Sequence, residues 1–186
     1  LNETSDTFKK NAAIFGKVYF PRIIMPISIV ISNLLKFGIQ FLIFIGFFIY
    51  YSLNGANLSM NNLVFLFPLL VVVMGVLGLG LGMIISSLVT KYRDLSFLVT
   101  FGVQLLMYIS AVMYPMSLLK EKIPTYSWVI EYNPLAYVVE ASRYLLLNTG
   151  NLSINGMLYT IVVAVLLLIV GLLTFNKTEK SFIDTV

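Results

Sequence analysis

Four stretches of this sequence are apolar for long enough to cross a lipid bilayer. They cover residues 23–51, 63–89, 95–112 and 157–175. A helix needs about 20 mostly apolar residues to cross the hydrocarbon core, and these stretches lack the apolar–polar alternation of barrel strands. Since lipid offers no partner to an unpaired backbone group, such stretches fold as helices. The sequence therefore predicts an all-α, polytopic transmembrane helical bundle with four spans.

The composition agrees with an integral membrane protein and excludes several kinds of active site. Hydrophobic residues make up 59% and charged residues 11% of the 186 residues, whereas an average soluble domain has about 25% charged residues. The sequence contains no cysteine and no histidine, which excludes disulfide frameworks, thiolate zinc sites and imidazole catalysis. The predicted spans contain no acidic residue. We therefore expect no metal site, no catalytic residues and no enzymatic activity in this chain.

Basic residues beside the spans predict how the chain is oriented. The loop of residues 52–62 carries no charge, as expected of a short outer loop, since Lys and Arg concentrate on the cytoplasmic side. With four spans, both ends of the chain and all of these basic residues face the cytoplasm. Because they flank apolar stretches, they indicate topology and not a nucleic-acid partner. They are Lys9, Lys10, Lys17, Arg22, Lys91, Arg93, Lys177 and Lys180.

Residues 113–147, between the last two spans, are predicted to dip into the outer leaflet and return. Their apolar part, 135–147, is shorter than a span, and a fifth span would place the C-terminal tail outside. An amphipathic helix lying on the outer surface as a passive cap is the alternative. Tyrosines are frequent here, which fits an aromatic belt at the membrane interface as well as a surface on which sugar rings stack.

A short helix is predicted to begin at Asn133-Pro134 within this region. Asparagine is a favourable N-cap, and proline is a favourable first helical residue. Glu140 and Arg143 are three residues apart, so they can pair on one face of this helix.

Lys36 is a charged residue inside a predicted span. It lies roughly 20 Å along the first span if the helix begins near residue 23. A charge at that depth is costly unless it is paired or hydrated, and it marks a candidate functional residue. Three arrangements would lower this cost. Lys36 could face a polar interior, pair with a residue outside this sequence, or extend its side chain to the membrane interface.

Two local motifs follow in the second span and the turn after it. The run GVLGLGLGM resembles a nucleotide loop, but no Lys-Ser/Thr follows it. Gly78 and Gly82 instead form a small-xxx-small pair that lets another helix approach closely. In the cytoplasmic turn KYRD, Arg93 maintains the topology and Asp94 can cap the next helix. Before the first span, residues 9–22 are basic with scattered apolar positions, which fits either a helix that docks a cytoplasmic partner or a juxtamembrane flank.

Taken together, four segments resemble one family. In order, they are NAAIFGKVYFPR before a span, KYRD between spans, SAVMYP after the next span, and YNPLAYVVEASRY. This series resembles the membrane subunit of type-2 ABC transporters that export lipid-linked polysaccharides such as O-antigen, capsule and teichoic acid. The resemblance covers nearly the whole chain.

The resemblance implies a division of the chain within one transmembrane domain. Family permeases have six spans, so two would precede this chain, and residues 1–22 would form a cytoplasmic region that couples to an ATPase. Residues 113–147 would form two short outer gate helices, and residues 176–186 a cytoplasmic tail. The implied coupling residues are Lys9, Lys10, Asn11, Phe15, Lys17 and Tyr19. The implied outer-gate residues are Tyr114, Pro115, Asn133, Pro134, Tyr137, Glu140 and Arg143.

The resemblance also implies partners and a location. The chain would be a permease in a bacterial inner or plasma membrane, paired with a second copy of itself and surrounded by membrane lipids. A separate ABC ATPase subunit would bind ATP and Mg²⁺, so no cofactor is expected in this chain. The substrate would be a lipid-linked glycan. The alternatives are a type-2 permease for drugs or small lipids, and an ATP-independent channel or scaffold.

Overall fold

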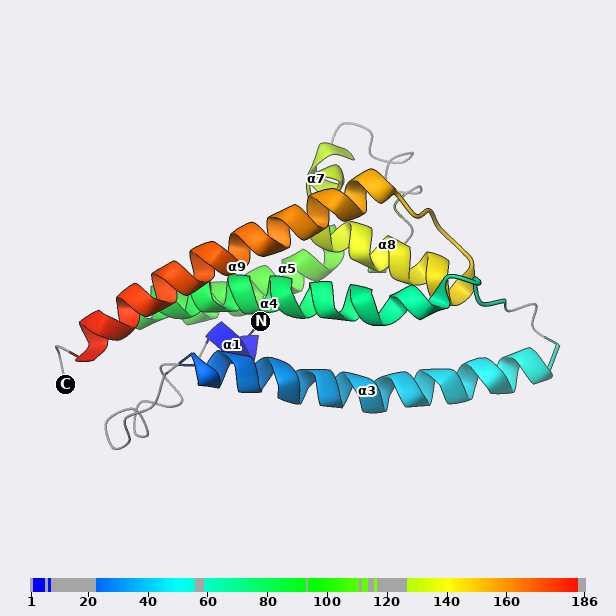
Figure 1. Ribbon diagram of the computed structural model, residues 1–186, viewed down its shortest axis with the longest axis horizontal. Helices are drawn as coiled ribbons and strands as arrows, with labels where there is room; N and C mark the ends of the chain where they lie inside the picture. The colour runs from blue at the N-terminus through cyan, green and yellow to red at the C-terminus, as the bar shows by residue number, and fades with distance from the viewer. Residues whose placement is uncertain are drawn as a thin grey trace.

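A computed structural model of the chain describes residues 2–5, 7, 23–55, 59–92, 94–110, 112–113, 116 and 127–183. The regular elements within these residues are all helices (Figure 1), which confirms the predicted all-α class. They are α1 (Asn2–Ser5), α3 (Ile24–Leu53), the short 3-10 helix η1 (Val64–Leu66), α4 (Phe67–Lys91), α5 (Leu95–Ile109), α7 (Ser127–Glu131), α8 (Pro134–Leu147) and α9 (Ile154–Ile183).

Three of the four predicted spans are helices long and apolar enough to cross a membrane. They comprise Ile24–Leu53, Val64–Lys91 and Ile154–Glu179. The third predicted span, residues 95–112, differs, because α5 has only 15 residues. At 1.5 Å per residue its length is about 22 Å, less than the roughly 30 Å of a hydrocarbon core.

The end of α5 explains this difference. At Ser110 the backbone leaves helical geometry, with φ −81° and ψ 13°. The Ser110 hydroxyl donates to the Leu106 carbonyl at 2.6 Å, and such side-chain bonds compete with continued helix formation. Val112 and Met113 then form bends. The apolar pattern of the sequence continues to residue 112, but the helix does not.

α4 and α9 lie side by side, and α8 packs against both near the beginning of α4 (Figure 1). Lipid tails are as apolar as these side chains, so close packing is what holds the helices together. The buried core that α4, α8 and α9 share consists of Phe67, Leu70, Val73, Leu77, Val138, Ala141, Leu145 and Ala164.

Glycines bring α4 and α9 into backbone contact. A Cβ atom at Gly80 would lie 2.7 Å from the backbone of Leu167 and Leu168, and one at Gly171 would lie 2.6 Å from the Gly80 carbonyl oxygen. The predicted packing pair of Gly78 and Gly82 is therefore only half right. Gly82 packs on Thr4 of α1, but a Cβ at Gly78 would meet no atom within 4 Å.

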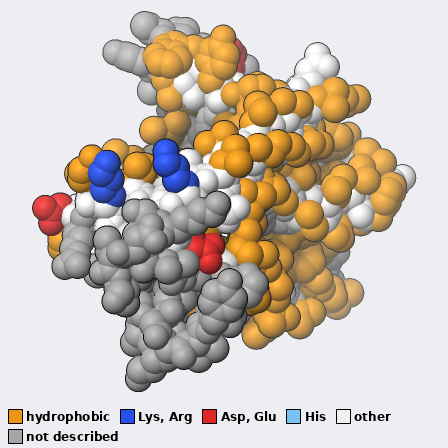
Figure 2. Space-filling view, turned by 60° about the vertical axis from the view of Figure 1, so that its left-hand side comes forward, with side chains coloured by type: hydrophobic (Ala, Val, Ile, Leu, Met, Phe, Trp, Pro, Cys, Tyr) orange, Lys and Arg blue, Asp and Glu red, His pale blue; other side chains and the backbone are white. Residues whose placement is uncertain are grey.

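α3 lies on the other side of α4 and is the least enclosed of the long helices (Figure 1). None of its most apolar 18-residue window is buried, against 28% for α4. Figure 2 shows a surface on which hydrophobic side chains predominate and most of the visible charged side chains lie in one part. This surface is suited to lipid or to further helices and not to water.

Candidate functional site

The helix predicted at Asn133-Pro134 is present as α8. Asn133 is its N-cap, and the Asn133 side chain accepts a hydrogen bond from the Leu135 N–H at 3.0 Å. Pro134 is the first helical residue. The helix ends at Leu147, and Asn148 is its C-cap, with a left-handed backbone, φ 53°, and an N–H that donates to the Tyr144 carbonyl at 3.1 Å. Local sequence signals thus determine both ends of α8.

The Asn133 side chain also joins α8 to the end of α5, because its Nδ2 donates to the Ser110 hydroxyl at 3.0 Å. We expect Asn133→Ala to lose this bond and the cap together, a cost of at least about 1 kcal/mol, or a melting temperature lower by about 2–4 °C. Asn133→Asp keeps a cap acceptor and loses only the donor, so its loss should be smaller. Thermal unfolding of the purified protein in detergent would measure both. Equal losses in the two variants would contradict the role of the cap.

Tyr137 is packed against α9. A Cβ at Gly156 would clash with the Tyr137 ring, so that ring lies against the glycine backbone. The Tyr137 ring also lies edge-on to Tyr159, with ring centroids 6.4 Å apart. Tyr132, by contrast, is 71% exposed. Of these tyrosines, Tyr132 and not Tyr137 therefore offers a free ring face.

Glu140 and Arg143 pair as predicted, with Arg143 Nη1 3.6 Å from Glu140 Oε2. Glu140 is buried, with 5% of the residue exposed. Its Oε2 also accepts a hydrogen bond from the Met116 N–H at 3.4 Å, and Arg143 Nη2 donates to the Val112 carbonyl at 2.6 Å. The pair thus connects α8 to the chain that leaves α5.

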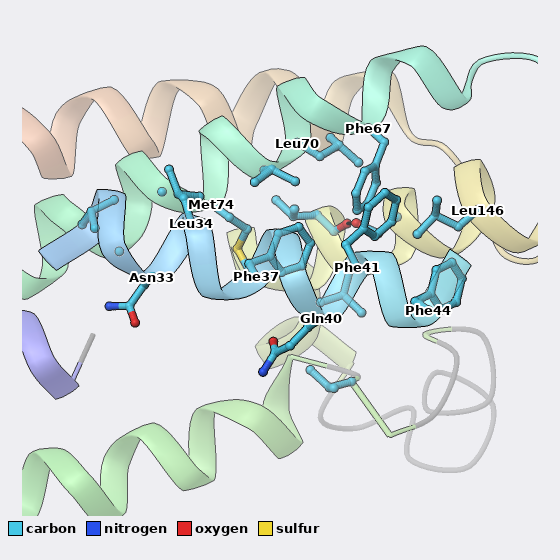
Figure 3. A pocket seen from close by; sticks show the side chains of 18 of the residues that line it. Asn33, Leu34, Phe37, Gln40, Phe41, Phe44, Phe67, Leu70, Met74 and Leu146 are labelled. Carbon is cyan, nitrogen blue, oxygen red and sulfur yellow. Dashed lines mark hydrogen bonds between the residues drawn. The ribbon is translucent and has the colours of Figure 1, made fainter. Parts of the chain in front are cut away.

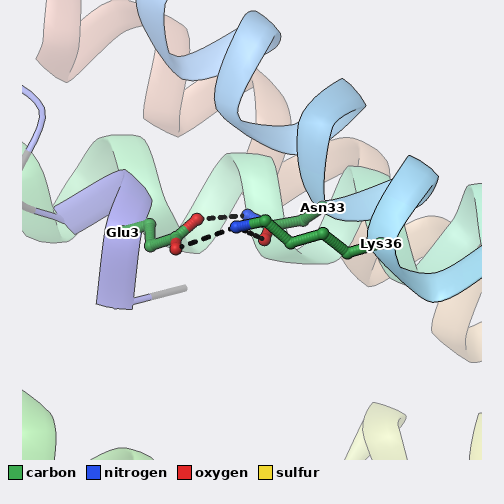
Figure 4. A network of polar contacts seen from close by, with 3 residues as sticks. All are labelled: Glu3, Asn33 and Lys36. Carbon is green, nitrogen blue, oxygen red and sulfur yellow. Dashed lines mark hydrogen bonds and ion pairs between the residues drawn. The ribbon is translucent and has the colours of Figure 1, made fainter. Parts of the chain in front are cut away.

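Lys36 has a partner that the sequence did not reveal. Its Nζ lies 3.3 Å from Glu3 Oε1 of α1, and Asn33 donates to the other Glu3 oxygen at 2.8 Å (Figure 4). α1 therefore lies beside α3 at the level of Asn33 and Lys36. Glu3 was missed because it belongs to a short polar segment far from Lys36 in the sequence.

An apolar cavity of about 810 Å³ opens between α3 and the α4–α8 side of the bundle (Figure 3). Phenylalanine rings form one wall: Phe41 of α3 stacks on Phe67 of α4 with centroids 4.8 Å apart, and Phe37 and Phe44 flank Phe41. Glu3 and Asn33 line it from α1 and α3, and Arg143 from α8. Its volume falls in the range of about 300–1,000 Å³ usual for ligand pockets. No sequence pattern predicted this cavity.

The remaining predicted residues are less informative. Asp94 occupies the N-cap position of α5 but makes no capping hydrogen bond, because its backbone is already helical with φ −71° and ψ −18°. The prediction of a side-chain cap is wrong. Among the described residues, no three His, Cys, Asp or Glu side chains come together as metal ligands. Predicted residues that lie outside the described part are Lys9, Lys10, Asn11, Phe15, Lys17, Tyr19, Arg93, Tyr114 and Pro115.

The long apolar helices and the lipid-compatible surface define an integral membrane protein with several spans. The sequence model of the family described as ABC-2 type transporter matches residues 2–147. The chain belongs to this family.

The names of the curated relatives specify what those proteins export, which the family description does not. Two proteins of Klebsiella pneumoniae, both called O-antigen export system permease protein RfbA, are 31% identical to this chain over 178 residues. The match covers 96% of this chain and 66% of each relative.

Proposed function

We propose that this chain forms part of the permease subunit of an ATP-driven exporter for a lipid-linked polysaccharide of the O-antigen type. The 31% identity to the two O-antigen export permeases, which extends over 96% of the chain, carries this proposal. Capsule and teichoic acid glycans are related cargoes of the same chemical class.

The geometry of α8 supports the proposed re-entrant gate. α8 begins beside the end of α5, where Asn133 bonds Ser110, and ends beside the loop before α4, where the Asn61 N–H bonds the Leu145 carbonyl at 3.2 Å. It is enclosed by α4 and α9 over its buried face. A passive cap on the membrane surface would lack such enclosure, so this packing favours a segment that enters the bundle and returns. The α3–α4 loop and Leu147 would then face outward, and both chain ends the cytoplasm.

The proposed complex contains two permease copies and a separate ABC ATPase that binds ATP and Mg²⁺. The coupling segment is proposed to lie within residues 9–19. It is basic and directly precedes α3, so movement of the ATPase would be transmitted to α3. In this scheme the permease guides the cargo, and hydrolysis takes place in the partner subunit.

The apolar cavity supports a cargo with a hydrocarbon chain, since phenylalanine rings form one of its walls, while Glu3, Asn33 and Arg143 line it elsewhere. The same observation also favours a second candidate, a type-2 permease for small lipids or apolar drugs. The two candidates differ in whether polysaccharide depends on the protein.

The test is to delete the full-length gene and measure lipid-linked glycan on the two faces of the inner membrane. We expect glycan to accumulate on the cytoplasmic face and surface polymer to be lost, and re-expression of the gene should reverse both effects. Unchanged surface polymer would reject the glycan exporter. In that case, increased sensitivity to apolar drugs in the same deletion strain would support the second candidate.

A further inference from the structure

Glu140 is a buried carboxylate that lies where three parts of the chain meet. Its own helix contributes Arg143, the stretch after α5 contributes the Met116 N–H, and the connection from α8 to α9 contributes Gly150. A buried carboxylate remains charged only if its oxygens are paired or hydrogen-bonded. Glu140 therefore depends on its two polar partners, Arg143 and the Met116 N–H, and on the space that Gly150 leaves for it.

Gly150 is adapted to this carboxylate. It has a backbone φ of +101°, which residues other than glycine rarely adopt. A Cβ atom at this position would lie 2.8 Å from Glu140 Oε1. Glycine thus lets the connection between α8 and α9 approach the carboxylate without a clash.

Within the described residues, the polar contacts between α8 and the chain leaving α5 come from one side of this helix. Asn133, Glu140 and Arg143 are spaced by seven and three residues, which places them on one side of a helix with 3.6 residues per turn. They bond in turn to Ser110, to Met116 and to Val112.

In the described residues, apolar packing supports the stretch after α5 at Met116, which lies in a buried cluster with Ile130 and Ala136, but hardly at Val112 and Met113. Val112 is 42% exposed and Met113 is 59% exposed, and only Met116 is buried. Apolar packing therefore contributes little at Val112 and Met113, and the polar side of α8 is what positions them.

We propose that Glu140 is a positioning residue that holds Val112 and Met116 against α8, with Arg143 and Gly150 completing its site. We call the contacts of Glu140 with the Met116 N–H and of Arg143 with the Val112 carbonyl the tether. The tether does not depend on the cargo. Its consequence for transport rests on the proposed function: an exporter with a released tether keeps its fold and loses export.

A cysteine reporter can test the tether, because the chain has no native cysteine. In a full-length permease without other cysteines, Met116→Cys would report on the tether, and Met83→Cys, a site that is 0% exposed in the α4–α9 core, would report on the fold. Each reporter is combined with Glu140→Gln and labelled with a water-soluble maleimide. We expect labelling at position 116 to be at least about ten-fold faster than with Glu140 present, a difference of about 1.4 kcal/mol, and position 83 to stay protected.

Gly150→Ala should release the tether without any change at Glu140. Gly55→Ala is its matched control, because Gly55 also has a positive φ, +88°, but a Cβ there would meet no atom within 4 Å. Faster labelling at position 116 in Gly150→Ala and not in Gly55→Ala would support the contact with the carboxylate. Equal labelling in the two glycine variants would overturn it.

The other outcomes separate the tether from the rest of the protein. Fast labelling at both 116 and 83 in Glu140→Gln would show that Glu140 supports the whole fold, and this would overturn the proposal. Continued protection at 116 in Glu140→Gln would also overturn the proposal, because the tether would then not depend on Glu140. Export by Glu140→Gln, per folded complex, should fall at least about five-fold, and unchanged export with a released tether would overturn its role in transport. If the protein with Glu140 exports no glycan, the proposed function fails, while the labelling results still decide the tether.

Discussion

Gly80→Ala should cause a large loss of folded protein, because the backbone of α9 occupies the space that the new methyl group needs. The Cβ would lie 2.7 Å from Leu167 and Leu168 backbone atoms, and backbone cannot rotate away as a side chain can. Separating the two helices would also weaken the packing of Gly171. We expect a cost at the upper end of about 1–3 kcal/mol for overpacking. This corresponds to a melting temperature lower by about 6–12 °C.

Gly78→Ala is the matched control in the same helix. A Cβ at Gly78 meets no atom within 4 Å, and alanine favours a helix over glycine by up to about 1 kcal/mol. This variant should be as stable as the unmodified protein or slightly more so. Fluorescence-detected size exclusion after detergent extraction, followed by thermal unfolding, would compare the two. Equal stability of Gly78→Ala and Gly80→Ala would contradict the close approach of α4 and α9.

Lys36→Glu should produce the second large effect, because it places two carboxylates beside each other along an apolar helix. Lys36 Nζ lies 3.3 Å from Glu3 in the unmodified protein. Reversal replaces attraction by repulsion in surroundings where one charge at the centre of a span already costs about 2.5–3.5 kcal/mol. We expect a comparable loss of stability, measured as the yield of folded protein in the membrane. Glu3→Lys should have the same effect by placing two ammonium groups together.

The double variant Glu3→Lys/Lys36→Glu provides the decisive control. It restores opposite charges, so it should recover most of the folded yield that either single variant loses. Asn33, which bonds Glu3 in the unmodified protein, can donate to a carboxylate or accept from an ammonium group. If the double variant were as poor as the sum of the single variants, the two residues would not act as a pair.

Local signals predicted local structure well. Asn133 and Pro134 determine the beginning of α8 through one cap and one preferred backbone angle, and both can be read directly from adjacent residues. The pairing of Glu140 with Arg143 follows from helix geometry in the same way. The early end of α5 could not be read so directly, because it depends on the conformation of Ser110 and not on hydrophobicity.

Contacts between distant segments were the part that sequence reasoning missed. A sequence run with glycine at every second position does not show which glycine faces α9. The prediction therefore named Gly78 and omitted Gly80. The pairing of Lys36 with Glu3 joins segments far apart in the sequence. The cavity is lined by residues of α1, α3, α4 and α8, and no single stretch determines it. For the predicted gate, the sequence named Glu140 but not its contacts with Met116 and Gly150.

The enclosure of α8 constrains the order in which the protein is assembled during its synthesis. α8 is too short to be inserted as an independent transmembrane helix, and its buried face packs on α9, which the ribosome makes later. The Glu140 carboxylate likewise lies against Gly150, beyond the end of α8. α8 therefore cannot reach its final position as it leaves the ribosome. It must wait at the translocon or the lipid headgroups until α9 has been inserted.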